Sequence, residues 1–360
     1  MATVPKARLT AGLILLVIVF VAAHAVFSVF RIVTTTAPDF FYYYQASQSF
    51  ISHIENPLHL LPPASLLVYA PLAVLPYPLV QGAWIIVSVA CLVFVVWQLG
   101  ALVGVTSWQH LSLMGVLAYA MFPTRFTLGM GQVNLIALAF VVYAVSLVRK
   151  NQVVLPGILF AYAMLLKPEL VLLLPVMVWA RKWPLLVIIS GVLIITEFVA
   201  RGLVYEGAQY IGIESLFESF IRGWASAGVY YNQGLSGLLV RAGFIQPWVY
   251  GILSVFVLII TLIARIKRPL PFEALLWSSL PVLILVEPIA WQHHLVFLLP
   301  TLFWLWMGTT DRVRRAALIV SFVLIGWNFA TLGFLDTMPL GWLVASHATV
   351  GVIMLWVLTL

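Results

Sequence analysis

Residues 9–30 read LTAGLILLVIVFVAAHAVFSVF, a run of 22 residues without Asp, Glu, Lys or Arg. Because the hydrocarbon core of a bilayer needs about 20 apolar residues in a helix, this run predicts a transmembrane helix. Its apolar residues are continuous and do not alternate with polar ones, which favours helices over the strands of a membrane barrel. The run is longer than a signal-peptide core, and no small-residue cleavage site follows it, so we expect a retained helix.

The composition of the whole chain is that of a polytopic membrane protein. Of the 360 residues, 64% are hydrophobic and 8% are charged, whereas about a quarter of the residues in a soluble domain are charged. The single cysteine, Cys91, excludes an intramolecular disulfide and a cysteine-based metal site. We interpret the net charge of +7 as a signal of membrane topology and not as an affinity for nucleic acid.

The basic residues gather in five clusters, which hold 12 of the 18 lysines and arginines. The clusters are Lys6/Arg8, Arg149/Lys150, Arg181/Lys182, Arg265/Lys267/Arg268 and Arg312/Arg314/Arg315. The positive-inside rule places all of them in the cytoplasm. Twelve crossings satisfy this requirement and leave both termini in the cytoplasm. The predicted spans are 9–30, 79–103, 110–124, 132–148, 153–167, 169–180, 183–203, 246–264, 272–287, 290–308, 314–334 and 338–358.

The segment 62–76 is apolar, but it is short and bounded by prolines. Counting it as a span would invert every later cluster, so we predict a re-entrant or interfacial helix on the outer side. The expected fold is therefore an all-α, polytopic bundle of about 12 transmembrane helices with additional outer-face helices. We expect one domain over residues 1–360, located in the plasma membrane, with the outer regions 31–78 and 204–245 capping the active site.

The outer stretch 37–47, APDFFYYYQAS, places Asp39 beside five consecutive aromatic residues. Two interpretations of Asp39 remain open. It can cap an outer amphipathic helix over residues 40–54, or it can act as a general base at the membrane–water boundary. Tyr43 and Tyr44 likewise suit a platform for sugar rings, although aromatic belts are common at membrane interfaces.

Three further outer motifs carry polar side chains. Gly131-Gln132-Val133-Asn134 opens a span just after Arg125, where a helix N-terminus can bind an anion or can be satisfied by its own side chains. Lys167-Pro168-Glu169 separates two short spans, where the lysine either binds an anion or snorkels to the surface with the glutamate. The outer loop 230–237 contributes Asn232 and Gln233.

The fourth motif is EPIAWQHH, residues 287–294. One of His293 and His294 can bind a phosphate or a hydroxyl group while the other packs. Their spacing is not that of a zinc-binding helix. No D-x-D triplet, Walker loop or dinucleotide glycine pattern occurs in the sequence, which argues against a metal site, a soluble nucleotide donor and ATP-driven transport.

Taken in chain order, these motifs resemble glycosyltransferase family 87, membrane enzymes of the GT-C class. The resemblance rests on Asp39-Phe40, Tyr43-Tyr44, Asn56-Pro57, Pro62-Pro63, Gly131-Gln132-x-Asn134, Lys167-Pro168, Asn232-Gln233 and Trp291-x-His293-His294. It implies transfer of a sugar, with mannose expected, from a polyprenyl phosphate to a glycolipid or glycan acceptor outside the cytoplasm. It also implies inversion at the anomeric carbon, with Asp39 as the catalytic base.

The resulting hypothesis gives each candidate residue a role. Asp39 is the base, and Tyr43, Tyr44 and Trp291 form a platform for the acceptor and sugar. The residues expected to bind the donor phosphate and sugar are Lys167, His293, His294, Arg125, Gln132, Asn134, Asn232 and Gln233. We expect no metal or other cofactor, membrane lipids as surroundings and no nucleic-acid partner.

Two other classes of function stay open from the sequence. A lipid-linked-sugar flippase or other transporter would place polar groups on both faces and through the middle of the bundle. A non-catalytic assembly subunit would explain the hydrophobicity of the chain. The outer charges are singletons beside Gly, Pro, Asn, Gln and His, whereas the inner charges gather at loop ends, and this asymmetry favours an enzyme.

Overall fold

The computed structural model describes residues 34–52, 63–203, 227–328 and 338–360, with isolated positions between 19 and 30. Within these ranges every regular element is a helix, apart from one antiparallel bridge between Asn232 and Trp291. Most of the predicted span 9–30, the motif residues Asn56, Pro57 and Pro62, and loop residues 204–226 lie outside the described part of the chain.

The first half of the molecule packs around α7. Its elements are α2 (Pro38–Ile51), α3 (Pro63–Tyr69), the 3-10 helix η1 (Ala70–Val74), α4 (Tyr77–Leu102), α5 (Trp108–Ala120), α6 (Phe122–Met130), α7 (Asn134–Arg149), α8 (Val154–Leu166), the 3-10 helix η2 (Pro168–Leu173), α9 (Leu174–Trp179) and α10 (Trp183–Leu203). Helix α7 is buried on most sides between α4 and α8, with Leu138 and Val142 fully enclosed. A helix that is apolar all round belongs in such a central place.

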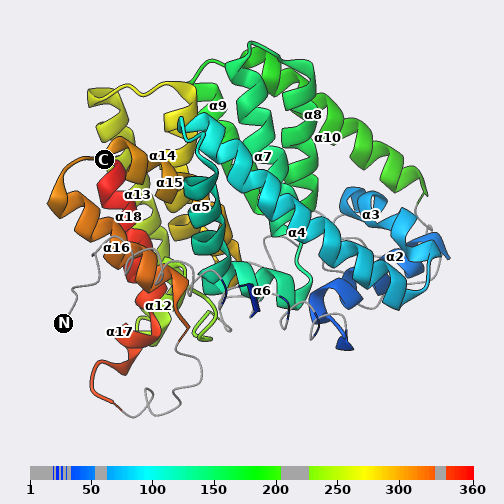
Figure 1. Ribbon diagram of the computed structural model, residues 1–360, viewed down its shortest axis with the longest axis horizontal. Helices are drawn as coiled ribbons and strands as arrows, with labels where there is room; N and C mark the ends of the chain where they lie inside the picture. The colour runs from blue at the N-terminus through cyan, green and yellow to red at the C-terminus, as the bar shows by residue number, and fades with distance from the viewer. Residues whose placement is uncertain are drawn as a thin grey trace, which may run out of the picture.

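The second half packs around α14 and α18. Its elements are α12 (Leu235–Arg241), α13 (Pro247–Lys267), α14 (Phe272–Val286), the 3-10 helix η3 (Gln292–Leu298), α15 (Leu299–Gly308), α16 (Arg312–Gly326), α17 (Gly341–Ala345) and α18 (His347–Thr359). Helix α18 lies against α14 and α16. Figure 1 shows α6, α12 and α17 toward one end of the molecule and the C-terminus toward the other.

Three described helices, α4, α10 and α13, are long and apolar enough to cross a membrane. The pair α5 and α6 makes a fourth span if its 66° bend lies within one crossing, and six further apolar elements have 10–17 residues. The described residues thus form a helical membrane protein. Length and composition identify fewer crossings among them than the twelve predicted, because helices below about 20 residues do not span the hydrocarbon core unaided.

Three predicted spans are broken, and a proline follows each break. The predicted span 110–124 ends as α5 and continues as α6, with Pro123 in its first turn. The predicted spans 169–180 and 290–308 each begin as a 3-10 helix and become α-helical just before Pro175 and Pro300. Proline suits the first turn of an α-helix, where its missing N–H needs no partner, so each of these prolines favours an α-helical start just after the break.

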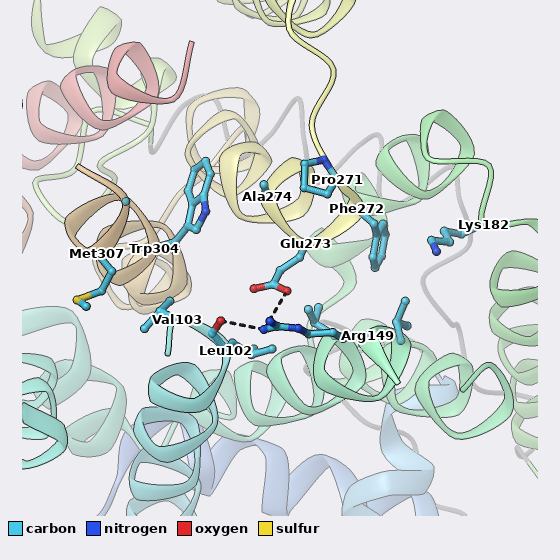
Figure 2. Close-up of a pocket in the computed structure, with 13 residues that line it drawn as sticks. Leu102, Val103, Arg149, Lys182, Pro271, Phe272, Glu273, Ala274, Trp304 and Met307 are labelled. Atoms are coloured by element: carbon cyan, nitrogen blue, oxygen red, sulfur yellow. Dashed lines mark hydrogen bonds and ion pairs between the residues drawn. The ribbon is translucent and has the colours of Figure 1, made fainter. Parts of the chain in front are cut away.

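The end of the bundle where α7 finishes is tied together by Arg149. Its Nη1 donates to the Leu102 carbonyl of α4 at 2.9 Å and lies 3.9 Å from Glu273 Oε2 in the first turn of α14 (Figure 2). These residues line a pocket of about 530 Å³, with Lys182 over the Phe272 ring at its side. A cation in the last turn of α7 also interacts favourably with the helix dipole.

Candidate active site

The first turn of α2 packs directly on the turn between α6 and α7. Gly131 ends α6 in the left-handed region, with φ 69°. A Cβ at Gly131 would lie 2.5 Å from Phe40 Cβ and 3.0 Å from Ala37 Cβ, so only glycine fits the backbone and the space. The Trp84 indole donates to the Gly131 carbonyl at 2.9 Å. This close approach brings the start of α2 to Gln132.

Asp39 lies in the first turn of α2, but it does not cap the helix. The N-cap residue is Ala37, and Asp39 Oδ2 accepts a hydrogen bond from Gln132 Nε2 at 2.6 Å. The capping interpretation is therefore wrong, because the carboxylate is turned across to the next segment. The Gln132 Oε1 accepts from the Tyr43 hydroxyl at 2.8 Å, which fixes the orientation of the amide.

The pKa of Asp39 is raised above its ordinary value because burial disfavours the charged form. The Gln132 hydrogen bond and the charges of Lys167 and His294 act in the opposite direction and lower the pKa of Asp39, but less strongly. Lys167 and His294, which are far from Asp39 in the sequence, therefore lie near enough to influence the pKa of Asp39.

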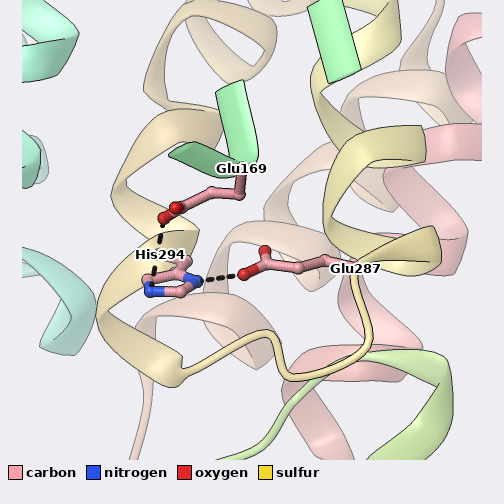
Figure 3. A group of neighbouring side chains, drawn as sticks. All are labelled: Glu169, Glu287 and His294. Atoms are coloured by element: carbon pink, nitrogen blue, oxygen red, sulfur yellow. Dashed lines mark ion pairs between the residues drawn. The ribbon is translucent and has the colours of Figure 1, made fainter. Parts of the chain in front are cut away.

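Lys167 and His294 meet in a buried polar cluster with two glutamates. Lys167 Nζ lies 3.2 Å from His294 Nε2 and 3.4 Å from Glu169 Oε1. On the other side of the ring, His294 Nδ1 lies 2.7 Å from Glu287 Oε1 (Figure 3). All four side chains are largely buried, so Lys167 is paired inside the protein and does not snorkel to the surface.

An ammonium group can only donate, so a neutral His294 ring beside Lys167 accepts through Nε2 and carries its proton on Nδ1. That nitrogen faces Glu287, although the ring N–H does not point straight along the short Nδ1–Oε1 line. Glu287 thereby favours the tautomer in which His294 presents its lone pair to Lys167.

Glu169, Glu287 and His294 are also residue types that bind divalent metals. Their ligand atoms lie within 4.8 Å of one another (Figure 3). However, the Lys167 ammonium already lies close to both His294 Nε2 and Glu169 Oε1. A metal ion shared by these two atoms would have to displace Lys167, so the cluster fits a metal poorly.

The His293 ring lies edge-on to the His294 ring, with centroids 4.6 Å apart, and its other ring neighbours are aromatic. It lies against Phe126, with centroids 5.6 Å apart, and is nearly parallel to Trp291 at 6.5 Å. The His293 carbonyl accepts from Asn134 Nδ2 at 2.8 Å and from Thr127 Oγ1 at 3.3 Å. Asn134 therefore holds the backbone of η3, while the His293 ring packs among aromatic side chains.

Asn232 and Gln233 hold the chain just before η3. The Gln233 N–H donates to the Ala290 carbonyl at 2.7 Å, and Asn232 Oδ1 accepts from the Ala290 N–H at 3.1 Å. The Gln233 amide nitrogen donates to the Ala345 carbonyl at 2.9 Å. Both side chains are fully buried and engaged with the protein, and they position the segment that carries Trp291.

Two predicted residues, Tyr44 and Arg125, remain to be placed. Tyr44 donates to the Leu75 carbonyl at 2.7 Å and accepts from Gln48, so its hydroxyl is used within the fold. Arg125 lies on α6, and its Nε is buried without a hydrogen-bond partner among the described residues.

The structure thus unites five of the predicted residues in one neighbourhood: Asp39, Tyr43, Gln132, Lys167 and His294. Sequence reasoning missed the roles of Glu169 and Glu287. Both glutamates lie inside motifs that the sequence analysis describes. Each is an acid next to a proline in an apolar stretch, and this pattern could have indicated a functional role.

Comparison with known proteins places these residues in a wider context. A sequence model of glycosyltransferase family 87 matches residues 60–288, which include Gln132 and Lys167 but neither Asp39 nor the histidine pair. The chain is 29% identical over 281 residues to a polyprenol-phosphate-mannose-dependent alpha-(1-2)-phosphatidylinositol pentamannoside mannosyltransferase of Mycolicibacterium smegmatis, covering 76% of this chain and 66% of the relative.

A protein of the same name from Mycobacterium tuberculosis is 28% identical over 279 residues, which cover 75% of this chain and 62% of that relative. The chain therefore spans slightly less than two thirds of the length of these relatives. No solved structure matches the chain significantly.

Proposed function

The chain belongs to glycosyltransferase family 87, and from this premise we propose that it transfers mannose from a polyprenyl-phosphate donor to a glycolipid acceptor. The names of both curated relatives specify a polyprenol-phosphate-mannose donor and a phosphatidylinositol mannoside acceptor. One observation carries the proposal. The Asp39 carboxylate, held by Gln132, lies within electrostatic reach of Lys167 and His294. Neither a flippase nor an assembly subunit requires this arrangement.

Asp39 acts as the general base in this proposal. It accepts the proton of an acceptor hydroxyl as that oxygen attacks the anomeric carbon of the donor, and the bond from this carbon to the phosphate oxygen breaks with inversion. The electron pair stays on the leaving phosphate. The raised pKa makes Asp39 a stronger base once ionised, and a positioned base contributes about 10²–10⁴-fold in rate.

Lys167 stabilises the negative charge that develops on the leaving phosphate, and His294 holds the ammonium group of Lys167 in place. An ammonium group has three N–H donors, and the contacts with His294 and Glu169 leave one of them for the ligand. In a buried site such a preoriented cation acts strongly on a developing charge. Lys167 supplies the positive charge that a metal would otherwise provide, so the proposed reaction needs no metal cofactor.

The other candidate residues support the site or extend it. Gln132 orients Asp39, while Asn134, Asn232 and Gln233 position the backbone around η3. Arg125, whose Nε has no described partner, is a second phosphate-binding candidate. Tyr43, Trp291 and His293 offer aromatic surface for the sugar and acceptor.

The architecture proposed with this function is a GT-C bundle with about twelve crossings over residues 1–360. Both termini lie in the cytoplasm of a plasma-membrane protein, and Asp39 lies on the extracytoplasmic side. The regions 31–78 and 204–245 cover the site. The basic clusters at the turns between spans support this orientation.

The substitution Asp39→Asn tests the proposal directly. We expect transfer from a polyprenyl-phosphate mannose donor to fall about 10²–10⁴-fold because the base is lost. Donor affinity and thermal stability should stay near those of the wild type, because the amide retains the size of the side chain. Asp311→Asn is a matched control, since Asn also caps helices well and Asp311 caps α16 far from the site. Near-normal turnover by the Asp39 variant would exclude Asp39 as the base.

A further inference from the structure

Three arginines line one pocket at the ends of α13, α15, α16 and α18. The pocket has a volume of about 380 Å³ and is lined by Arg265, Arg268 and Arg314, together with Trp304, Leu305 and Leu318. No acidic residue is among the described residues that line it. In the pocket of Figure 2, by contrast, Arg149 is paired with Glu273. The volume lies within the range of small-molecule sites, about 300–1,000 Å³.

This arginine pocket is separate from the candidate active site. Helix α18 begins beside Gln233, which accepts from the Thr349 N–H near its first turn, and it ends at Thr359 beside Arg265. At 1.5 Å per residue, the ten residue steps from Thr349 to Thr359 put about 15 Å between the two contacts. The arginines are therefore not part of the proposed transfer chemistry.

The three guanidinium groups converge on the C-terminal end of α18. Arg314 Nη2 donates to the Leu358 carbonyl at 3.4 Å, Arg265 Nη1 to the Thr359 carbonyl at 2.9 Å, and Arg268 Nη1 to the Leu360 carbonyl at 3.3 Å. A helix C-terminus carries about half a negative charge. Even a free carboxylate at Leu360 would neutralise only one of the arginines, so the pocket keeps an excess of positive charge.

Arg265 shows this excess most clearly. It is only 4% exposed, and its Nε is buried without a hydrogen-bond partner among the described residues. Arginine is almost never buried without an opposite charge, because desolvation of an unpaired cation is very unfavourable. Asp311, the acid nearest in sequence to Arg314, accepts from the Arg314 backbone N–H and does not line the pocket.

We propose that this pocket binds the phosphate of an anionic phospholipid. Guanidinium groups match phosphate oxygens in charge and geometry. The rest of the lining is apolar or aromatic, and Ile266 and Val313 on the flanking helices are exposed apolar side chains. The phosphate of a phospholipid can bind the arginines while its acyl chains contact the apolar side chains. A soluble phosphate can bind only the arginines. Basic pockets between transmembrane helices bind anionic headgroups in this way.

Thermal unfolding of the full chain in detergent, titrated with phosphatidylglycerol, tests the proposal. We expect a saturable rise of the unfolding midpoint with this lipid, because a ligand that binds the folded state stabilises it. Phosphatidylcholine and inorganic phosphate at equal concentration should leave the midpoint unchanged. An equal rise with inorganic phosphate would show a soluble-anion site, and an equal rise with phosphatidylcholine would show unspecific lipid binding. Either result would overturn the proposal.

Charge-matched variants separate this pocket from general electrostatic attraction. Arg268→Gln and Arg314→Gln should weaken the apparent affinity for phosphatidylglycerol about tenfold, the effect of losing one charge-assisted hydrogen bond. Lys267→Gln and Arg312→Gln remove the same charge from exposed neighbours that do not line the pocket, and should change the affinity less than about twofold. Equal weakening in all four variants would contradict the proposal. Arg265 is left intact because its buried contacts support the fold.

Discussion

The carboxylate that we propose as the base, Asp39, accepts a hydrogen bond from Gln132, which lies 93 residues away in the sequence. Burial raises the pKa of Asp39, and the Gln132 amide opposes this by donating to the charged form. A base must be ionised to accept a proton, so the transfer rate should rise with pH through the pKa of Asp39. The pH at which the rate rises, the acid limb of the pH–rate profile, therefore reports the pKa of Asp39.

The substitution Gln132→Met should move the acid limb of log kcat/KM to higher pH. It removes the hydrogen bond that lowers the pKa of Asp39, so the pKa rises and a higher pH is needed to ionise the base. Tyr43→Phe should shift the limb less, because it removes the contact that orients Gln132 Oε1 but leaves the amide donor beside Asp39. The idea fails if the Gln132 variant titrates at the wild-type position, or if both variants shift alike.

The side chains that meet in the candidate site could be singled out from the sequence, but their partners could not. Asp39, Lys167 and the histidine pair were identifiable as polar residues in an apolar chain. The contact between Lys167 and His294 spans 127 residues and depends on how two broken helices pack. The contact between Glu287 and His294 could not be predicted either. His293 and His294 are adjacent, and the sequence does not say which of the two rings faces Glu287.

At the scale of elements, the helices were predictable and their breaks were not. The predicted spans 183–203 and 153–167 agree closely with α10 and α8, because continuous apolar residues mark a buried or lipid-facing helix. Apolar continuity does not distinguish an α-helix from a 3-10 turn. Consequently the conformations of η2 and η3 were missed, although they or their flanks carry Lys167, Glu169 and both histidines.

The docking of α2 on the α6–α7 turn gives a prediction about Gly131. Gly131→Ala should destabilise the protein by about 2–4 kcal/mol, since it combines a strained positive φ with overpacking against Phe40 and Ala37. It should also reduce transfer, because α2 carries Asp39. Thermal unfolding and the transfer assay measure the two effects.

Gly129→Ala is the matched control for Gly131→Ala. Gly129 lies in α6 without a positive φ, and a Cβ added there would meet no atom within 4 Å. Alanine at this position should therefore be neutral or stabilising by about 0.5–1 kcal/mol. Similar behaviour of the two alanine variants would argue against close α2 packing as the source of the Gly131 effect.

At the scale of the whole molecule, the two ends of the bundle differ in chemistry. One end gathers the breaks of α5–α6 and η3, together with the start of α2, around singly placed polar residues. The other end gathers basic clusters at the ends of α7, α13 and α16. This asymmetry supports an enzyme with one catalytic face and suggests which face lies in the cytoplasm.

Labelling of single cysteines in intact cells tests this orientation. In a Cys91→Ala background, a membrane-impermeant maleimide should label a cysteine at Gln246, an exposed residue before α13. Cysteines at Gln152 and Thr310, exposed in turns beside basic clusters, should react only after the cells are permeabilised. Labelling of Gln152→Cys in intact cells would reverse the orientation of the turn between α7 and α8. Because that turn and the start of α2 lie at opposite ends of α7, it would also place Asp39 on the cytoplasmic side, where the proposed extracytoplasmic transfer could not occur.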